Sequence, residues 1–95
     1  MAVVFQGFSS VPQIVVGPIT ADIGECLAGY LKEADLTVPG SQPGMHFIVT
    51  APDLEDNLAI VSAVCATAGT VAIRIMNATV GNIDPASQSF YVIGL

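Results

Sequence analysis

Glycine and proline residues divide this chain into short segments, and their spacing limits its possible folds more than any other feature. The runs between them are rich in Val, Ile, Thr and Phe. Short β-branched runs bounded in this way are typical of antiparallel strands, because Gly and Pro favour turns and interrupt helices. The breakers are Gly7, Pro12, Gly17, Pro18, Pro39, Gly40, Pro43, Gly44, Pro52, Gly69, Gly81 and Pro85. The pattern predicts an all-β fold, a small antiparallel β-sandwich or a barrel-like domain.

The clearest predicted strand covers residues 70–78, where branched apolar side chains occupy alternate positions. A period of two places these side chains on one face of a strand. Residues 58–66 predict a second strand, and residues 68–70 predict the hairpin turn that joins the two. Further strands are predicted at residues 2–5, 13–16, 35–38, 45–50 and 90–93.

Residues 22–34 fit two interpretations. Asp22 and Glu25 match the capping box that begins many helices. Gly24 and Gly29 argue against a helix, because each glycine costs a helix about 1 kcal/mol relative to alanine. The apolar residues at helical spacing are Ile23, Leu27, Tyr30, Leu31 and Ala34. From the residues alone, a short helical turn and a strand with a loop remain equally open.

Charged residues are scarce in this chain. Lys and Arg number 2 against 8 Asp and Glu, and charged residues make up 11% of the 95 residues, whereas globular chains carry about 25%. Lys32 and Arg74 cannot form a phosphate-neutralising patch, so we expect no nucleic-acid partner. The same shortage removes polybasic attraction to anionic membranes.

Two uncharged stretches raise the question of membrane insertion or export. Residues 57–73 are shorter than the roughly 20 apolar residues of a spanning helix and include Ser, Thr and Gly, so we expect no membrane partner. Residues 1–21 lack the basic region and cleavage pattern of a signal peptide, so we expect an unexported chain that is mature from Met1. In that setting Cys26 and Cys65 are expected to be two buried free thiols.

The sequence contains no recognisable catalytic, cofactor or metal constellation. His46 is the single histidine and has no second histidine for zinc and no nucleophile in a triad-like context. The acidic run at 53–56 lacks EF-hand spacing and predicts a solvated loop. Residues 77–79 match a glycosylation sequon, but without an export signal they predict a transition from strand to turn. We therefore expect no catalytic, cofactor-binding or metal-binding residue, and no enzyme.

Arg74 lies in the middle of an otherwise apolar predicted strand. An arginine at such a position must reach solvent, a carboxylate or a neighbouring chain. Asp84, in the turn that follows, is the partner suggested by the sequence.

The C-terminal part of the chain resembles a recurring segment of known structural proteins. In residues 69–95, an apolar strand with a central Arg precedes Asn-x-Thr, a turn containing Asp-Pro-Ala and a final aromatic strand. Residues 37–40 (TVPG), the Pro-Gly pair at 43–44 and the strand that runs into 50–52 (TAP) fit the same pattern. Over residues 35–95 the chain resembles small β-sandwich structural proteins of tailed bacteriophages, such as capsid decoration (cement) proteins, head fibres or spike modules.

The resemblance implies a role in the virion and favours extended structure over residues 22–34. The implied function is a capsid decoration (cement) protein that binds and stabilises the shell as a homo-oligomer. The alternative is a tail or head-fibre or spike module that contacts the host surface. The implied partners are other copies of the chain, in a trimer, and the major capsid protein. The implied location is the capsid surface, after synthesis in the host cytoplasm.

The segment before residue 18 is an addition to the family pattern. We expect residues 1–17 to form an extended N-terminal arm and residues 18–95 to form the β-sandwich domain. Such an arm could span roughly 55 Å and add a strand to a neighbouring subunit. The expected interface residues are Val3, Val4, Phe5, Phe8, Ile14, Val15 and Val16.

Overall fold

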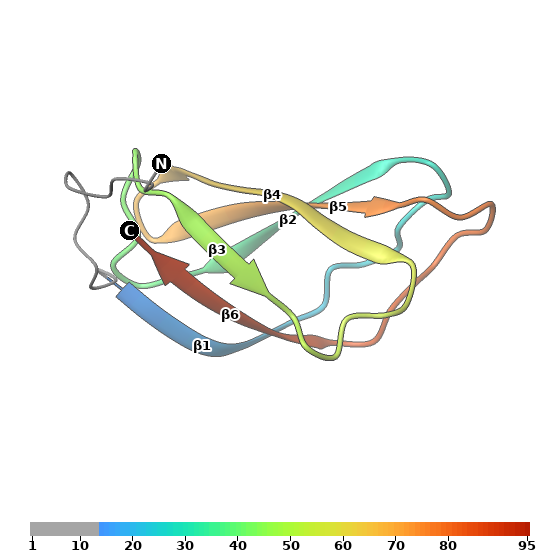
Figure 1. Ribbon diagram of the computed structural model, residues 1–95, viewed down its shortest axis with the longest axis horizontal. Coiled ribbons are helices and arrows are strands. Elements are labelled where there is room, and N and C mark those ends of the chain that lie inside the picture. The colour runs from blue at the N-terminus through green and yellow to red at the C-terminus, as the bar shows by residue number, and fades with distance from the viewer. Residues whose placement is uncertain (1–13) are drawn as a thin grey trace, which may run out of the picture.

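The computed structural model describes residues 14–95, which form two antiparallel sheets of three strands each and contain no helix. The strands are β1 (Ile14–Ala21), β2 (Leu31–Thr37), β3 (Phe47–Thr50), β4 (Leu58–Thr67), β5 (Thr70–Asn77) and β6 (Gln88–Gly94). The sheets have the orders β1-β6-β3 and β2-β5-β4, and they face each other as two layers (Figure 1). The predicted all-β sandwich is confirmed.

The two sheets differ in charge. No Asp, Glu, Lys or Arg occurs in β1, β6 or β3, and we call this layer the uncharged sheet. The layer made of β2, β5 and β4, which we call the charged sheet, carries four charged residues. They are Lys32, Glu33, Asp35 and Arg74.

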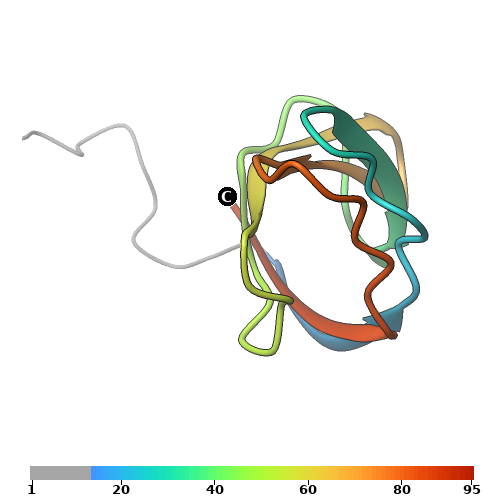
Figure 2. The ribbon, with the colours of Figure 1, turned by 90° about the vertical axis from the view of Figure 1, so that its right-hand side faces the viewer.

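The core lies between the two layers and is supplied mainly by their central strands. In β5, Val71, Ile73 and Ile75 are fully buried while Arg74 is exposed, so the predicted alternation over residues 70–78 is confirmed. Phe90 and Val92 of β6 are buried against them. Burying such a side chain contributes about 1.5–3 kcal/mol relative to leaving it exposed. Viewed along the long axis, the strands curve around this core like a barrel (Figure 2).

The segment at 22–34 is a loop followed by a strand, so the helical interpretation is wrong. The Asp22 carboxylate accepts a hydrogen bond from the Gly24 backbone N–H at 2.9 Å, which closes a turn rather than capping a helix. Gly24 has a φ of 78° and Gly29 a φ of 76°, a backbone conformation that glycine adopts readily and a helix does not contain. The loop is held by a backbone bridge between Cys26 and Ile83.

Most predicted strands are present with shifted ends, and the turn at Ala68 and Gly69 joins β4 to β5 as predicted. The largest shift is in β1, which continues through Pro18 to Ala21. Its register to β6 shifts between Val16 and Ile19, and β1 is an edge strand, where a proline removes no required ladder hydrogen bond. The predicted strand at 2–5 lies outside the described residues.

Two further expectations concern the cysteines and the uncharged residues 57–73. Cys26 and Cys65 are buried free thiols, as predicted. Residues 57–73 contain β4 and the first half of β5, which pair as an antiparallel hairpin. Within residues 14–95 there is no helix with the length and apolar character needed to cross a membrane.

Candidate assembly surfaces

An apolar row crosses the outer face of the uncharged sheet. The register places Val15 of β1 opposite Ile93 of β6, and Ile93 opposite Ile48 of β3. Val15 is 72% exposed and Ile48 is 54% exposed. Side chains opposite each other on adjacent strands lie about 4.5–5.5 Å apart, so the three form one continuous strip.

Tyr91 extends this strip along β6. Its side chain is 42% exposed, and its ring lies close over Gly17 of β1. A Cβ atom added at Gly17 would come within 2.6 Å of Tyr91 Cδ1, so the glycine makes room for the ring. We call the surface formed by Val15, Ile48, Tyr91 and Ile93 the apolar face.

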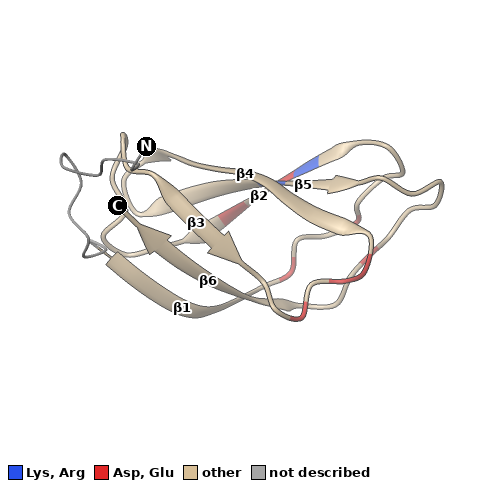
Figure 3. Ribbon diagram, in the orientation of Figure 1, with Lys and Arg blue, Asp and Glu red and all other residues tan. Residues whose placement is uncertain are grey.

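The end of the molecule next to the apolar face also lacks charged side chains. It holds the C-terminus and the loop of residues 38–46, none of which is Asp, Glu, Lys or Arg (Figure 3). Backbone hydrogen bonds between His46 and Leu95, at 3.2 and 2.9 Å, tie this loop to the end of β6. The His46 side chain is exposed.

Six of the eight acidic residues gather toward the other end of the molecule. These six lie in three loops, which connect β1 to β2, β3 to β4 and β5 to β6 (Figure 3). The Asp53 carboxylate accepts a hydrogen bond from the Ser89 backbone N–H at 3.2 Å. The acidic residues of these loops are Asp22, Glu25, Asp53, Glu55, Asp56 and Asp84. Within residues 14–95, no three His, Cys, Asp or Glu side chains gather closely enough to hold a metal ion.

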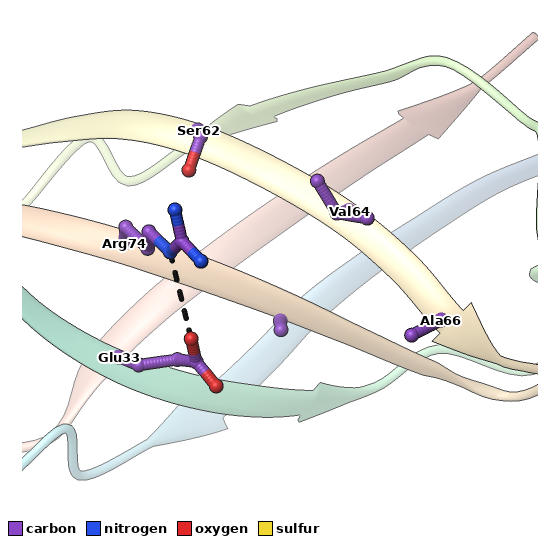
Figure 4. Close-up of a pocket in the computed structure, with 6 residues that line it drawn as sticks. Glu33, Ser62, Val64, Ala66 and Arg74 are labelled. Atoms are coloured by element: carbon purple, nitrogen blue, oxygen red, sulfur yellow. Dashed lines mark ion pairs between the residues drawn. The ribbon is translucent and has the colours of Figure 1, made fainter.

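The charged sheet has a shallow groove of about 270 Å³ on its outer face, which we call the groove (Figure 4). At one side of it, Arg74 Nε lies 3.5 Å from Glu33 Oε2, and both side chains are more than half exposed. The residues that line the groove are Glu33, Ser62, Val64, Ala66, Ala72 and Arg74.

The Arg74–Glu33 pair corrects the predicted pairing of Arg74 with Asp84. The register of β2 and β5 places Glu33 directly opposite Arg74. Asp84 lies in the loop beyond the end of β5. Sequence proximity suggested Asp84, whereas the partner comes from a strand that is distant in sequence, and strand register cannot be deduced from spacing alone.

Buried Asn77 joins two loops at the acidic end of the molecule. Its Nδ2 donates hydrogen bonds to the Cys26 and Gly81 carbonyl oxygens at 2.8 and 2.9 Å. Its Oδ1 accepts from the Thr79 backbone N–H at 3.0 Å and from Thr79 Oγ1 at 2.7 Å. Asn77 ends β5, as the expected transition from strand to turn requires. Its role as a loop connector was not visible in the sequence, because Cys26 is remote along the chain.

Exposed apolar side chains stand on the two loops that Asn77 joins. Val80 is completely exposed, and Leu27 and Tyr30 are also exposed. Leu27 follows Cys26, and Val80 precedes Gly81, so both are adjacent to residues that Asn77 holds. We call these three residues the loop tip.

Cys26 belongs to the loop between β1 and β2, and its side chain is buried in the core. Burial raises the pKa of this thiol above its usual value, Lys32 opposes this, and the nearby negative charge of Asp84 acts in the same direction as burial. A raised pKa keeps the thiol protonated and weakly nucleophilic at neutral pH. The environment of Cys26 therefore suits a core residue.

The structure describes three of the seven predicted interface residues, and all three lie in β1. Val15 points outward and contributes to the apolar face, whereas Ile14 and Val16 are partly buried and pack against the core. Val3, Val4, Phe5 and Phe8 lie outside the described residues, as do residues 1–13 of the predicted arm. Residues 14–17 belong to β1.

Sequence reasoning missed the other members of the apolar face. Ile48 and Ile93 come from different strands, and only the register of β6 between β1 and β3 brings them together with Val15. The sequence feature that could have indicated this surface is the absence of charged residues from the segments that form β1, β3 and β6.

Comparison with known proteins gave no match: no protein-family model, no curated protein and no solved structure corresponds to this chain.

Proposed function

We propose that this chain is a structural assembly protein whose apolar face and adjoining uncharged end are covered by a partner surface. The observation that carries the proposal is the partition of charge between the sheets: the uncharged sheet exposes Val15, Ile48 and Tyr91 with no charged residue in its strands. Covering such a face removes apolar area from water, which is favourable by about 25 cal/mol per Å². It also buries no charge, so the large desolvation penalty of ionic groups does not arise.

The more specific proposal is a bacteriophage capsid decoration (cement) protein. Its support is the resemblance of residues 35–95 to small β-sandwich structural proteins of tailed phages, together with a fold of that class. In this proposal, three copies form a closed homotrimer, and the apolar face rests on the major capsid protein at the outer surface of the shell. Closed symmetry limits growth, because every contact surface is satisfied within the assembly.

Quantitative mass spectrometry of purified virions tests the more specific proposal. A decoration protein is expected at a copy number comparable to that of the major capsid protein. Absence from the particles would reject the virion role.

Measuring the binding of variants to purified capsids tests whether the apolar face makes the proposed contact. We expect Val15→Lys to weaken binding at least tenfold, because binding would then bury an unpaired ammonium group. Thr37→Lys adds the same charge at an exposed position of β2 and serves as the matched control. Equal binding by the two variants would remove the apolar face from the proposal.

A second candidate function is a fibre or spike module that contacts the host surface. The observation that favours it is the loop tip, where Leu27, Tyr30 and Val80 are exposed on loops held by Asn77. Only a few copies per particle would be expected in that case. The copy number in virions therefore separates the two functions.

A further inference from the structure

We propose that the groove on the charged sheet binds residues 2–8 of a neighbouring copy of the same chain. This inference rests on the proposed function for the existence of an oligomer, and it specifies the contact that would build it. The argument uses the shape of the groove, its charge and the place where the uncharged segment leaves the domain.

The lining of the groove includes the small side chains of Ala66 in β4 and Ala72 in β5. Val64, on the same strand as Ala66, also lines it (Figure 4). Val64 is an exposed apolar residue of β4. An apolar side chain inserted here would contact methyl groups on several sides and would cover Val64.

The charge of the groove matches an uncharged occupant. Its two ionic side chains, Arg74 and Glu33, already pair with each other. Residues 1–13 contain no Asp, Glu, Lys or Arg, so their docking would add no charged side chain to the contact and would leave the pair intact, at the cost of partly desolvating it. An acidic or basic occupant would compete with that pair. The apolar side chains that this segment offers are Val3, Val4, Phe5 and Phe8.

The position of Ile14 favours a neighbouring copy over the same molecule. Ile14 begins β1 in the uncharged sheet, whereas the groove is on the outer face of the charged sheet. The segment thus joins the domain in the layer opposite to its own groove. When residues 2–8 occupy a groove, only residues 9–13 connect them to Ile14, and an extended connection of this length spans about 20 Å. The shortest dimension of the described domain is 22 Å, so this connection favours the groove of a neighbouring copy that lies beside Ile14.

A contact between the segment of one copy and the groove of the next is heterologous, because two different surfaces meet. Such contacts close into a ring when the rotation between copies is suitable, and three copies then form a trimer. The groove thus supplies the head-to-tail contact that a trimer needs, and it leaves the apolar face free for the shell.

Disulfide trapping between two variants that each carry one added cysteine tests the proposal directly. One full-length chain carries Gln6→Cys and a mass tag, and the other carries Ser62→Cys, which lines the groove. We expect the mixed disulfide under mild oxidation, while Cys26 and Cys65 remain buried. Ser87→Cys, at an exposed loop position, replaces Ser62→Cys as the control.

Two outcomes of the trapping experiment would overturn the proposal. One is equal disulfide yield with Ser62→Cys and with the Ser87→Cys control. The other is a disulfide that forms only within one chain when Gln6→Cys and Ser62→Cys are combined.

A pair of lysine variants on β4 supplies an independent measurement. Ala66→Lys places a charged side chain in the groove, whereas Ala59→Lys places one at an exposed outer position of the same strand, outside the groove. We expect Ala66→Lys to raise the dissociation constant of self-association at least tenfold in analytical ultracentrifugation, and Ala59→Lys to change it less than twofold. Equal effects would overturn the proposal, and thermal unfolding of both variants verifies that they fold.

Failure of this inference and failure of the proposed function give different results. A trapped disulfide with no copies in virions would reject the virion role and retain the groove contact. Abundant copies in virions without a groove-specific disulfide would retain the function and reject the contact.

Discussion

The two sheets have similar inner faces and different outer faces. Their central strands, β5 and β6, bury Ile73 and Phe90 completely in the shared core. Outside, the charged sheet presents Arg74 paired with Glu33, whereas the uncharged sheet presents Val15 and other apolar side chains. The inner faces stabilise the fold by burying side chains in one core, so both must be mainly apolar. The outer faces are under no such requirement, so they are free to differ.

The largest expected loss of stability comes from substitutions on the inner faces, and it should be similar for the two sheets. Phe90→Ala should lower the free energy of unfolding by about 3–5 kcal/mol and Ile73→Ala by about 2–5 kcal/mol, since each leaves a cavity in a close-packed core. Urea unfolding of both variants measures this. A loss below about 1 kcal/mol for one of them would show that its sheet does not share the core equally.

A smaller loss of stability is expected from substitution of Asn77, at the end of β5 in the charged sheet. Asn77→Ala removes a buried side chain with four hydrogen bonds and leaves the partly buried Thr79 backbone N–H without that acceptor, while the Cys26 carbonyl keeps the hydrogen bond from the Ile83 N–H. Loss of such bonds, with a polar group left unsatisfied, costs about 1–3 kcal/mol. Thermal or urea unfolding should show a loss in this range.

Asn82→Ala is the matched control for Asn77→Ala. Asn82 Oδ1 accepts a single exposed hydrogen bond, from the Ala28 backbone N–H at 2.9 Å. Its removal should cost less than about 1 kcal/mol. If the two variants lose equal stability, Asn77 is not the main connection between the loops.

The smallest energy is expected for the Arg74–Glu33 pair on the outer face of the charged sheet. A double-mutant cycle with Arg74→Ala and Glu33→Ala should give a coupling energy of about 0.2–1 kcal/mol, because both side chains are largely exposed and screened by solvent. The coupling should decrease as salt is added. The same cycle with Arg74→Ala and Asp84→Ala should give none, and a larger coupling there would restore the pairing suggested by the sequence.

Local pattern predicted much of the sandwich. The alternation around Ile73 and Ile75 indicated β5, and the turn at Ala68 and Gly69 indicated its hairpin with β4. These predictions succeeded because strand period and turn chemistry act over a few neighbouring residues. The loop at 22–30 was ambiguous because its apolar residues fit a helix, and the glycine conformations and the Cys26–Ile83 bridge decided against one.

The surfaces depended on contacts between distant segments. The sequence indicated a shortage of charge, but it did not show that the uncharged strands form one sheet. That follows from β6 pairing with both β1 and β3, which brings residues near both ends of the described chain next to the middle. The groove depends in the same way on β4 and β2 flanking β5.

The sequence by itself determined an all-β chain with alternating core positions, few charges and buried thiols, because these properties depend on residue type and local spacing. Only the tertiary structure decided that Arg74 meets Glu33, that Asn77 holds two loops, and that Val15, Ile93 and Ile48 form one strip. The physical reason is that strand order and register are set by the packing of the whole core. A shift of one residue would turn every outward side chain inward.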